Sequence, residues 1–238
     1  MPQNKLTEIL FDAPVMVKEG VFNDEELNTI TSKHLFHQYA FSVWKKYYLL
    51  FHYGNLIRSV ENIAKENNLK RSLEIGCGTA STSIYLAKRQ FIAYSLGLDI
   101  NSERIRLAEK RIKWHRADRC EVKKASALDM QNESTFDLIY SMFAFELIKP
   151  LEAVLKQTLK NLSKRGHIVL DLANPSYIRN SRKHFSKSDF DFMVQFFLNH
   201  GLTVKTEYHS LLTGIDPTGL LKKSAAYNKA VRVHAYRT

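Results

Sequence analysis

A glycine-rich turn at residues 73–80 carries the residue types of a binding site for a nucleotide-like ligand. The segment reads Leu-Glu-Ile-Gly-Cys-Gly-Thr-Ala, and it joins an apolar strand to a helix expected over residues 81–88. Gly76 and Gly78 lack a Cβ, so the backbone can turn sharply and a ligand can approach the main chain closely. The free N–H groups and the dipole of the helix face the same turn. Glu74 adds a buried acid beside it.

Two families of cofactor use such a turn, and the spacing of the glycines separates them. The dinucleotide fingerprint is G-x-G-x-x-G/A, and Ser81 stands at its third position here. The pattern Glu-x-Gly-x-Gly-x-Ala from Glu74 to Ala80 instead resembles the first motif of class I S-adenosylmethionine (SAM) methyltransferases, D/E-x-G-x-G-x-G. Ala80 replaces the last glycine of that motif.

Three later segments extend this resemblance in the same order, over residues 71–172. Residues 94–100 form a short apolar strand ending in Asp99, whose carboxylate suits a ribose diol. Residues 125–130, Ala-Ser-Ala-Leu-Asp-Met, resemble the third segment of the family, in which a polar and a small residue meet the adenine. Residues 136–147 resemble strand four and the segment after it, with Leu147 where histidine is common.

The resemblance implies SAM as the cofactor and S-adenosylhomocysteine (SAH) as its product. It places Asp99 on the ribose hydroxyls and Ser126 with Ala127 beside the adenine. Ser141 falls at the methionine end of the cofactor. The full set of cofactor-binding residues that it implies is Glu74, Gly76, Cys77, Gly78, Ala80, Asp99, Ile100, Ser126, Ala127, Ser141 and Tyr47.

Alternating strand and helix patterns from residue 70 onward predict an α/β fold with a doubly wound, mainly parallel sheet. Helices are expected after each of the first four strands and over residues 188–199. Seven strands with the last antiparallel, inserted between the fifth and sixth, are what the resemblance implies. The division expected is an N-terminal helical cap, residues 1–69, before a SAM-binding domain, residues 70–238. The strands are expected near residues 71–75, 94–99, 120–125, 136–141, 166–172, 202–208 and 230–236.

An aromatic stripe at helical spacing runs through the N-terminal segment from Phe36 to Phe51. It can pack on the sheet domain, or part of it can close over the cofactor and shape an acceptor pocket. N-terminal helices of the family often cover the methionine end of the cofactor. The resemblance therefore makes Tyr47, Tyr48 and His52 candidates for this site.

Methyl transfer needs mainly in-line positioning, so a base matters only where the acceptor must lose a proton. Glu146 follows strand four at the sheet edge where open α/β sheets bind ligands, and it could orient or deprotonate an acceptor. The alternative is that Glu146 caps or solvates a helix beginning near Pro150. The candidate catalytic residues are Glu146, His52 and Tyr48.

The tetrapeptide Asn174-Pro175-Ser176-Tyr177 resembles the N-P-P-Y motif of amino-group methyltransferases. That motif follows strand four, whereas this copy follows the expected fifth strand and has Ser176 at the second proline. A loop with a turn at Pro175 is the prediction.

The net charge of +11 raises the question of a nucleic-acid partner. Residues 101–124 carry nine basic residues against four acids, a net of +5, on the helix after strand two. A solvated outer face is favoured over a phosphate-binding patch, and no RNA-binding module is recognised. A small-molecule acceptor is therefore favoured, with a tRNA or rRNA acceptor on this basic helix as the alternative.

Composition supports one large α/β domain and gives no indication of a membrane partner or a metal. No apolar stretch approaches the roughly 18 residues of a bilayer span, and a cytoplasmic location is expected. The two cysteines, Cys77 and Cys120, lack C-x-x-C spacing, so neither a disulfide framework nor zinc is expected. Residues 210–228 are long for a strand connection and are typical of a lid, a substrate wall or a dimer contact. A SAM-binding regulator without catalysis and an NAD(P)-dependent oxidoreductase remain further alternatives.

Overall fold

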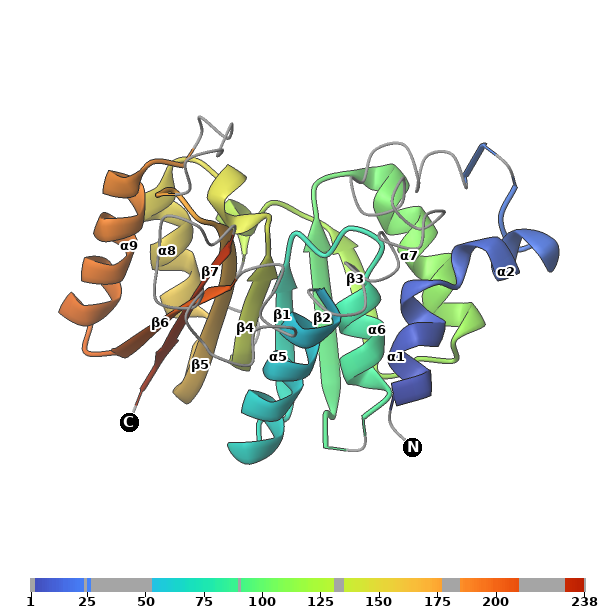
Figure 1. The fold of residues 1–238 in the computed structure, drawn as a ribbon, viewed down its shortest axis with the longest axis horizontal. Helices are drawn as coiled ribbons and strands as arrows, with labels where there is room; N and C mark the ends of the chain where they lie inside the picture. Colours follow the sequence, from blue (N-terminus) through green and yellow to red (C-terminus); the bar gives the residue numbers. More distant parts are fainter. Residues whose placement is uncertain are drawn as a thin grey trace, which may run out of the picture.

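A seven-stranded sheet in the order β3-β2-β1-β4-β5-β7-β6 organises the chain (Figure 1). The computed structural model describes residues 3–23, 25–26, 53–89, 91–130, 135–176, 185–209 and 230–237. The first five strands are parallel, and β7 is antiparallel to both β5 and β6. The predicted strand number, the directions and the insertion of the last strand are confirmed. The strands are β1 (Arg71–Ile75), β2 (Tyr94–Asp99), β3 (Cys120–Lys124), β4 (Phe136–Met142), β5 (Leu162–Ala173), β6 (Thr203–His209) and β7 (Ala230–Tyr236).

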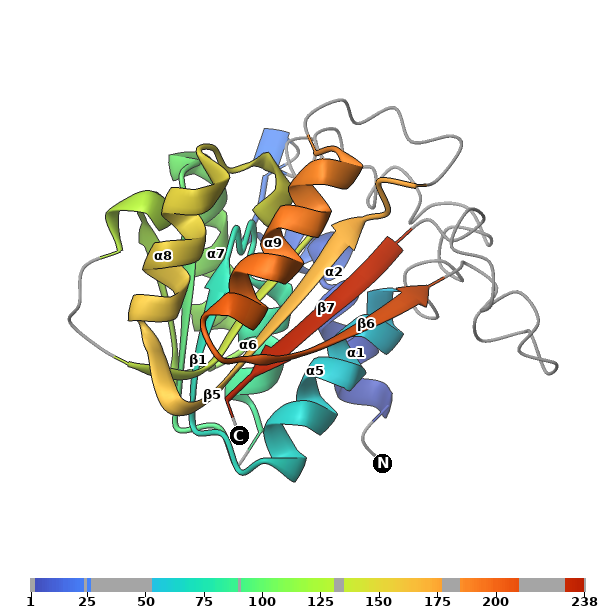
Figure 2. The same cartoon turned by 90° about the vertical axis from the view of Figure 1, so that its left-hand side faces the viewer.

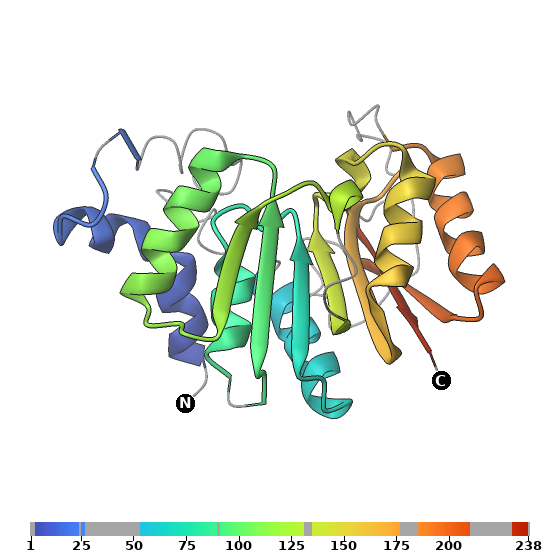
Figure 3. The same cartoon turned by 180° about the vertical axis from the view of Figure 1, so that it is seen from behind.

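Helices cover both faces of the sheet, as the alternating pattern requires. One apolar cluster joins the first face to α1 (Gln3–Leu10), α5 (Gly54–Glu66), α6 (Ser81–Ala87) and α7 (Ser102–Trp114). A second cluster joins the other face to α8 (Leu151–Lys160) and α9 (Lys187–Asn199), which Figure 3 shows from behind. Figure 2 looks onto the β6 edge, where α9 packs beside β6 and α8.

The prediction of a helix after the third strand is wrong for the residues that the structure describes. A short 3-10 helix, η2 (Ala127–Asp129), follows β3, and residues 131–134 lie outside the described part. The physical reason is length, because residues 125–135 are too few to hold an α-helix of ordinary size as well as its connections. A cavity of about 240 Å³ lies on the sheet face at this place, lined in part by Leu73, Tyr94 and Leu96.

The N-terminal helices pack against the first face of the sheet domain. Leu6, Ile9 and Leu10 join the core cluster that contains α6 residues. The next helix, α2 (Ala13–Lys18), packs through Ala13 and Met16 on α7. The aromatic stripe of residues 36–51 lies outside the described residues, as does the connection 210–228. No helix in the described ranges combines the length and the apolar composition that a bilayer span requires.

Candidate functional site

The glycine-rich loop between β1 and α6 forms the centre of the candidate site. Gly76 and Gly78 have φ values of +74° and +56°, in the left-handed region where a Cβ is unfavourable. A Cβ added to Gly76 would also overlap the Cβ of Ala144, which follows β4. The loop is therefore packed against the end of β4, and only glycine fits at Gly76.

The end of β2 fixes the shape of this loop. The Asp99 carboxylate accepts hydrogen bonds from the N–H of Gly78, through Oδ2 at 2.9 Å, and from the N–H of Asn101, through Oδ1 at 2.9 Å. The Leu98 carbonyl accepts the N–H groups of Gly76 and Cys77 at 2.8 and 2.9 Å. The structure thus brings together the glycine turn and the acid that the sequence paired with it. Each carboxylate oxygen keeps lone-pair capacity for a further donor.

Glu74 lies behind the loop and holds the start of α6. Its Oε2 accepts from the N–H and the hydroxyl of Ser83, at 3.1 and 2.6 Å, and from the hydroxyl of Tyr140 at 3.3 Å. Burial raises the pKa of Glu74 to about 7, although the hydrogen bonds from Ser83 oppose the shift. Ala80, the N-cap of α6, has no side chain that can cap, so Glu74 satisfies an N–H group of this helix end.

The segment predicted to meet an adenine lies beside the end of β2. The Ala125 N–H donates to the Asp99 carbonyl at 3.1 Å, and Ser126 caps η2 by accepting the Leu128 N–H at 3.1 Å. Ala127 is buried. Ile100, next to Asp99, is 72% exposed.

Ser141 and the residues after it approach the loop from β4. The Ser141 hydroxyl donates to the Ile75 carbonyl at 2.8 Å and is fully buried. Phe143 adopts a φ of +58°, and its N–H donates to the Asp171 carbonyl at 2.7 Å. A non-glycine residue in the left-handed region indicates local strain next to the site. The sequence carried no signal for this conformation.

Glu146 is buried at the end of β5. It lies in the 3-10 helix η3 (Phe145–Leu147), and its Oε1 accepts the Ala173 N–H at 3.3 Å. The helix near Pro150 is α8, which begins at Leu151. The other two candidate catalytic residues, Tyr48 and His52, lie outside the described residues, as does Tyr47. Asn174 and Pro175 follow β5, where the Asn174 Oδ1 accepts the Ser176 N–H at 2.9 Å in a turn.

A buried ion pair that the sequence did not indicate lies between β5 and β7 on the α5 face. The Asp171 carboxylate accepts from Nε and Nη2 of Arg232 at 2.7 and 2.6 Å, and Nη2 also donates to the Leu56 carbonyl at 3.0 Å. The two residues are 61 positions apart and become neighbours only because β7 inserts beside β5.

The basic helix α7 forms ion pairs with the N-terminal segment, and part of it faces solvent. Arg106 and Lys110 both form ion pairs with Glu26, and the Lys110 Nζ lies 2.7 Å from its carboxylate. Burial alone would raise the pKa of Glu26, but hydrogen bonds from Lys110 and Arg106 outweigh it and lower the pKa to about 2. Arg111 is 3% exposed and pairs with Asp12. Lys113 and Arg116 are exposed. The prediction of a solvated face holds for only part of this helix.

Comparison with protein families gives one match, which covers the site. A model described as a methyltransferase domain matches residues 65–212, more than half of the chain. The matched range runs from the end of α5 to beyond β6 and includes the glycine-rich loop, Asp99 and η2. A search of curated proteins found no match to the sequence.

Comparison with solved structures gives the same fold. The plantazolicin methyltransferase BpumL in complex with SAH is 17% identical, with a TM-score of 0.62 over 100% of this chain and 99% of that chain. The methyltransferase domain of bacterial CtHen1 is 16% identical, with a TM-score of 0.59 over 77% and 97%. The [4+2]-cyclase SpnF is 13% identical, with a TM-score of 0.59 over 76% and 80%. At these identities the likeness concerns the fold, which serves more than one reaction.

Proposed function

The chain belongs to the class I SAM-dependent methyltransferases, and from this membership we propose that it methylates a small-molecule acceptor at an O, N or C atom. The cofactor, when bound, supplies an activated methyl group whose bond to sulfur breaks as the bond to the acceptor forms. The protein then has to align the acceptor with that methyl group and exclude water.

The edge of the sheet at the carboxyl ends of β1, β2 and β4 is the proposed SAM site. The observation that carries this proposal is the glycine-rich loop bound to Asp99, with the exposed side chain of Ile100 beside it. We propose that free Asp99 lone pairs accept the ribose hydroxyls and that Ile100 and Ala127 contact the adenine.

Glu146 has a proposed role in positioning the acceptor. Its carboxylate is held by the Ala173 N–H at the end of β5, which ties η3 to that strand. A carboxylate fixed by this hydrogen bond orients the groups next to it. The reaction needs a base only for an acceptor that must lose a proton. Tyr48 and His52 are the proposed partners from the N-terminal segment, outside the described residues.

A small-molecule acceptor is favoured over RNA because part of the basic helix is already engaged. Arg106 and Lys110 form ion pairs with Glu26, and Arg111 is buried with Asp12. These three cations are therefore used within the chain, which reduces the charge that α7 offers to phosphates.

Calorimetry and a turnover assay test the proposal together. SAM and SAH are expected to bind, and NAD is not; tight NAD binding without SAM binding contradicts the cofactor assignment. Purified protein incubated with SAM and pools of small hydroxyl, amine and activated-carbon compounds should release SAH. SAH release with tRNA alone, together with RNA binding that falls steeply with salt, supports the RNA alternative. SAM binding without SAH release from any pool supports the regulator.

A further inference from the structure

We propose that Arg111 is a positioning residue for the SAM-binding loop and that Asp12 of the N-terminal segment holds it in place. The inference rests on the proposed function in one respect, namely that the glycine-rich loop binds SAM. It adds that the helices before the sheet domain, α1 and α2, are part of the machinery that shapes the cofactor site.

The loop side of the contact consists of three hydrogen bonds from one nitrogen of Arg111. Nη1 donates to the Thr79 carbonyl at 2.6 Å, to the Thr79 hydroxyl at 3.0 Å and to the Ser81 hydroxyl at 2.9 Å. Thr79 and Ser81 flank Ala80, where the loop becomes α6. Hydrogen bonds from a guanidinium are charge-assisted and stronger than neutral ones. The two to Thr79 are buried, and the one to Ser81 is partly buried.

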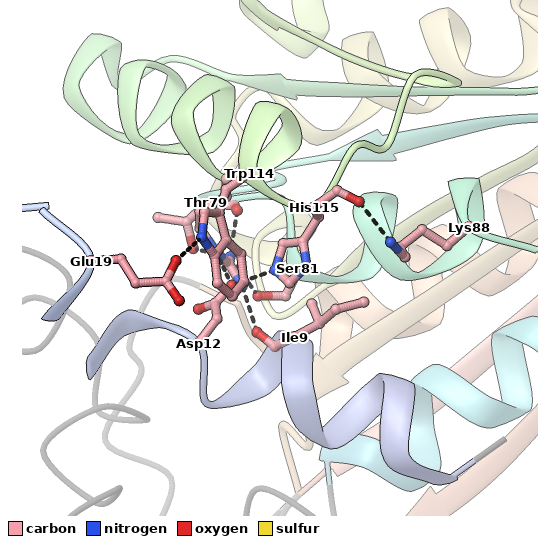
Figure 4. Close-up of polar contacts among 9 residues, drawn as sticks. Ile9, Asp12, Glu19, Thr79, Ser81, Lys88, Trp114 and His115 are labelled. Atoms are coloured by element: carbon pink, nitrogen blue, oxygen red, sulfur yellow. Dashed lines mark hydrogen bonds and ion pairs between the residues drawn. The ribbon is translucent and has the colours of Figure 1, made fainter. Parts of the chain in front are cut away.

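The opposite side of the guanidinium binds the N-terminal segment. Nε donates to the Asp12 carboxylate at 2.8 Å, and Nη2 donates to the Ile9 carbonyl at 2.6 Å. His115, one turn further along, lies with Nε2 at 2.7 Å from the same Asp12 oxygen. Figure 4 shows Ile9, in α1, and Asp12, between α1 and α2, facing Thr79, Ser81 and His115. A buried guanidinium needs a counter-ion, and Asp12 is 2% exposed.

The loop needs this support because its last residue is strained. Ala80 has a φ of +61°, a left-handed conformation that is unfavourable for a non-glycine residue. Such a conformation persists only where the surroundings hold it. The peptide group before Ala80 is held on both sides, by the bond from its N–H to the Cys77 carbonyl at 2.8 Å and by the bond from Arg111 to the Thr79 carbonyl. Loss of Arg111 frees one side of this peptide.

The same helix offers a matched control. Arg106 also links α7 to the N-terminal segment, through Glu26, and it has no hydrogen bond to the loop among the described residues. Arg106→Met therefore weakens the attachment of the N-terminal segment while leaving the loop contacts of Arg111 in place. Arg106 is half exposed, so Arg106→Met controls for the attachment of the N-terminal segment, and the thermal midpoints show how much each variant destabilises the fold.

The experiment measures SAM and SAH affinity by calorimetry, with the thermal midpoint and the amide exchange of the loop measured on the same variants. Arg111→Met and Asp12→Asn are expected to weaken SAM binding about 10-fold or more, since charge-assisted hydrogen bonds are lost. The Ala80 N–H should exchange faster in both variants. Arg106→Met should bind SAM within about 2-fold of the natural protein, because the loop contacts remain.

A pair of variants on the loop side keeps the test informative if Arg111→Met does not fold. Thr79→Val removes the hydroxyl that Arg111 contacts and keeps the Arg111–Asp12 pair, and it should weaken SAM binding about 3-fold. Thr79→Ser keeps the hydroxyl and should bind like the natural protein.

Two negative outcomes have different meanings. Folded Arg111→Met that binds SAM like Arg106→Met, with unchanged exchange at Ala80, overturns the inference. A natural protein that binds neither SAM nor SAH overturns the proposed function instead. In that case faster exchange at Ala80 in Arg111→Met still supports the role of Arg111 in shaping the loop.

Discussion

The Asp99 carboxylate lies 2.9 Å from the backbone nitrogen of Gly78 and accepts its hydrogen bond. The acid that ends β2 therefore shapes the glycine-rich loop directly, in addition to any contact with a ligand. The same carboxylate accepts the Asn101 N–H at 2.9 Å, next to the start of α7. One side chain thus joins the glycine-rich loop to the start of α7 at the edge of the sheet.

Asp99→Ala is expected to weaken SAM binding by about 1–3 kcal/mol, because ribose hydroxyls lose their acceptor and the Gly78 N–H loses its partner. Calorimetry measures the change. The control is Asp118→Ala, which removes an exposed acid after α7 and should bind SAM with unchanged affinity. Unchanged affinity in Asp99→Ala means that the ribose assignment is incorrect.

Gly76→Ala is expected to unfold the loop or abolish SAM binding. The residue has a φ of +74°, and a Cβ there overlaps Ala144. Gly20→Ala is a matched control, because Gly20 has a φ of +71° with nothing within 4 Å of the added atom. The free energy of unfolding of Gly20→Ala should fall by only about 1 kcal/mol, the cost of placing a Cβ on a backbone with positive φ. Urea unfolding and SAM titration compare the two, and equal effects would argue against tight packing at Gly76.

Asp171→Ala should lower the free energy of unfolding by about 3–5 kcal/mol, since it leaves the Arg232 guanidinium buried without its counter-ion. Glu152→Ala, which breaks the exposed pair with Lys156 at 2.6 Å, should cost no more than about 0.5 kcal/mol. Denaturant titrations of both variants give the two values. A small loss of unfolding free energy in Asp171→Ala would show that the Arg232 guanidinium hydrogen-bonds to water or to another acceptor in that variant.

Acidification should destabilise the protein through a histidine pair on β5 and β7. Nδ1 of His167 lies 2.9 Å from Nε2 of His234, so one of these nitrogens must be unprotonated. Burial, reinforced by the nearby His167 and Arg232, lowers the pKa of His234 from 6.5 to about 4. The unfolded chain therefore binds more protons between these values, and this contribution to stability is complete above pH 6.5 and is lost as the pH falls toward 4.

The thermal midpoint between pH 7.5 and pH 5 tests this pH dependence in the natural protein and in His234→Phe. The difference between the two removes the contributions of other groups, including Glu74, whose raised pKa acts in the opposite direction. The midpoint of His234→Phe should fall less on acidification. Parallel curves for the two proteins would contradict the prediction.

The strands and the glycine-rich loop were predictable because their signals are local. Apolar runs bounded by turn residues located all seven strands within a few residues, and the spacing of Gly76 and Gly78 marked the loop. Asp99 was also predictable, because the carboxyl ends of neighbouring parallel strands meet at one sheet edge. The prediction of a helix after β3 was wrong because it rested on the general alternation of strands and helices. The short connection between β3 and β4 does not follow that alternation.

The partners of the buried polar side chains were not predictable in the same way. Arg111 occupies a buried helix position three residues after Ala108, which signals burial and does not name a partner. Its counter-ion, Asp12, is 99 residues away, and Arg232 meets Asp171 only through strand insertion. Glu74, expected beneath the cofactor, also holds Ser83 at the start of α6.

The sequence by itself determined the alternation of strands and helices and the place of the loop, because backbone geometry and hydrophobic periodicity depend on near neighbours along the chain. The cofactor class followed from the resemblance of its motifs to those of a known family. The tertiary structure alone decided which charges hold that loop. The physical reason is that a buried charge is stabilised by whichever counter-ion the packing of distant elements brings to it. For Arg111, the counter-ion Asp12 is brought close because the N-terminal helices pack on α6 and α7.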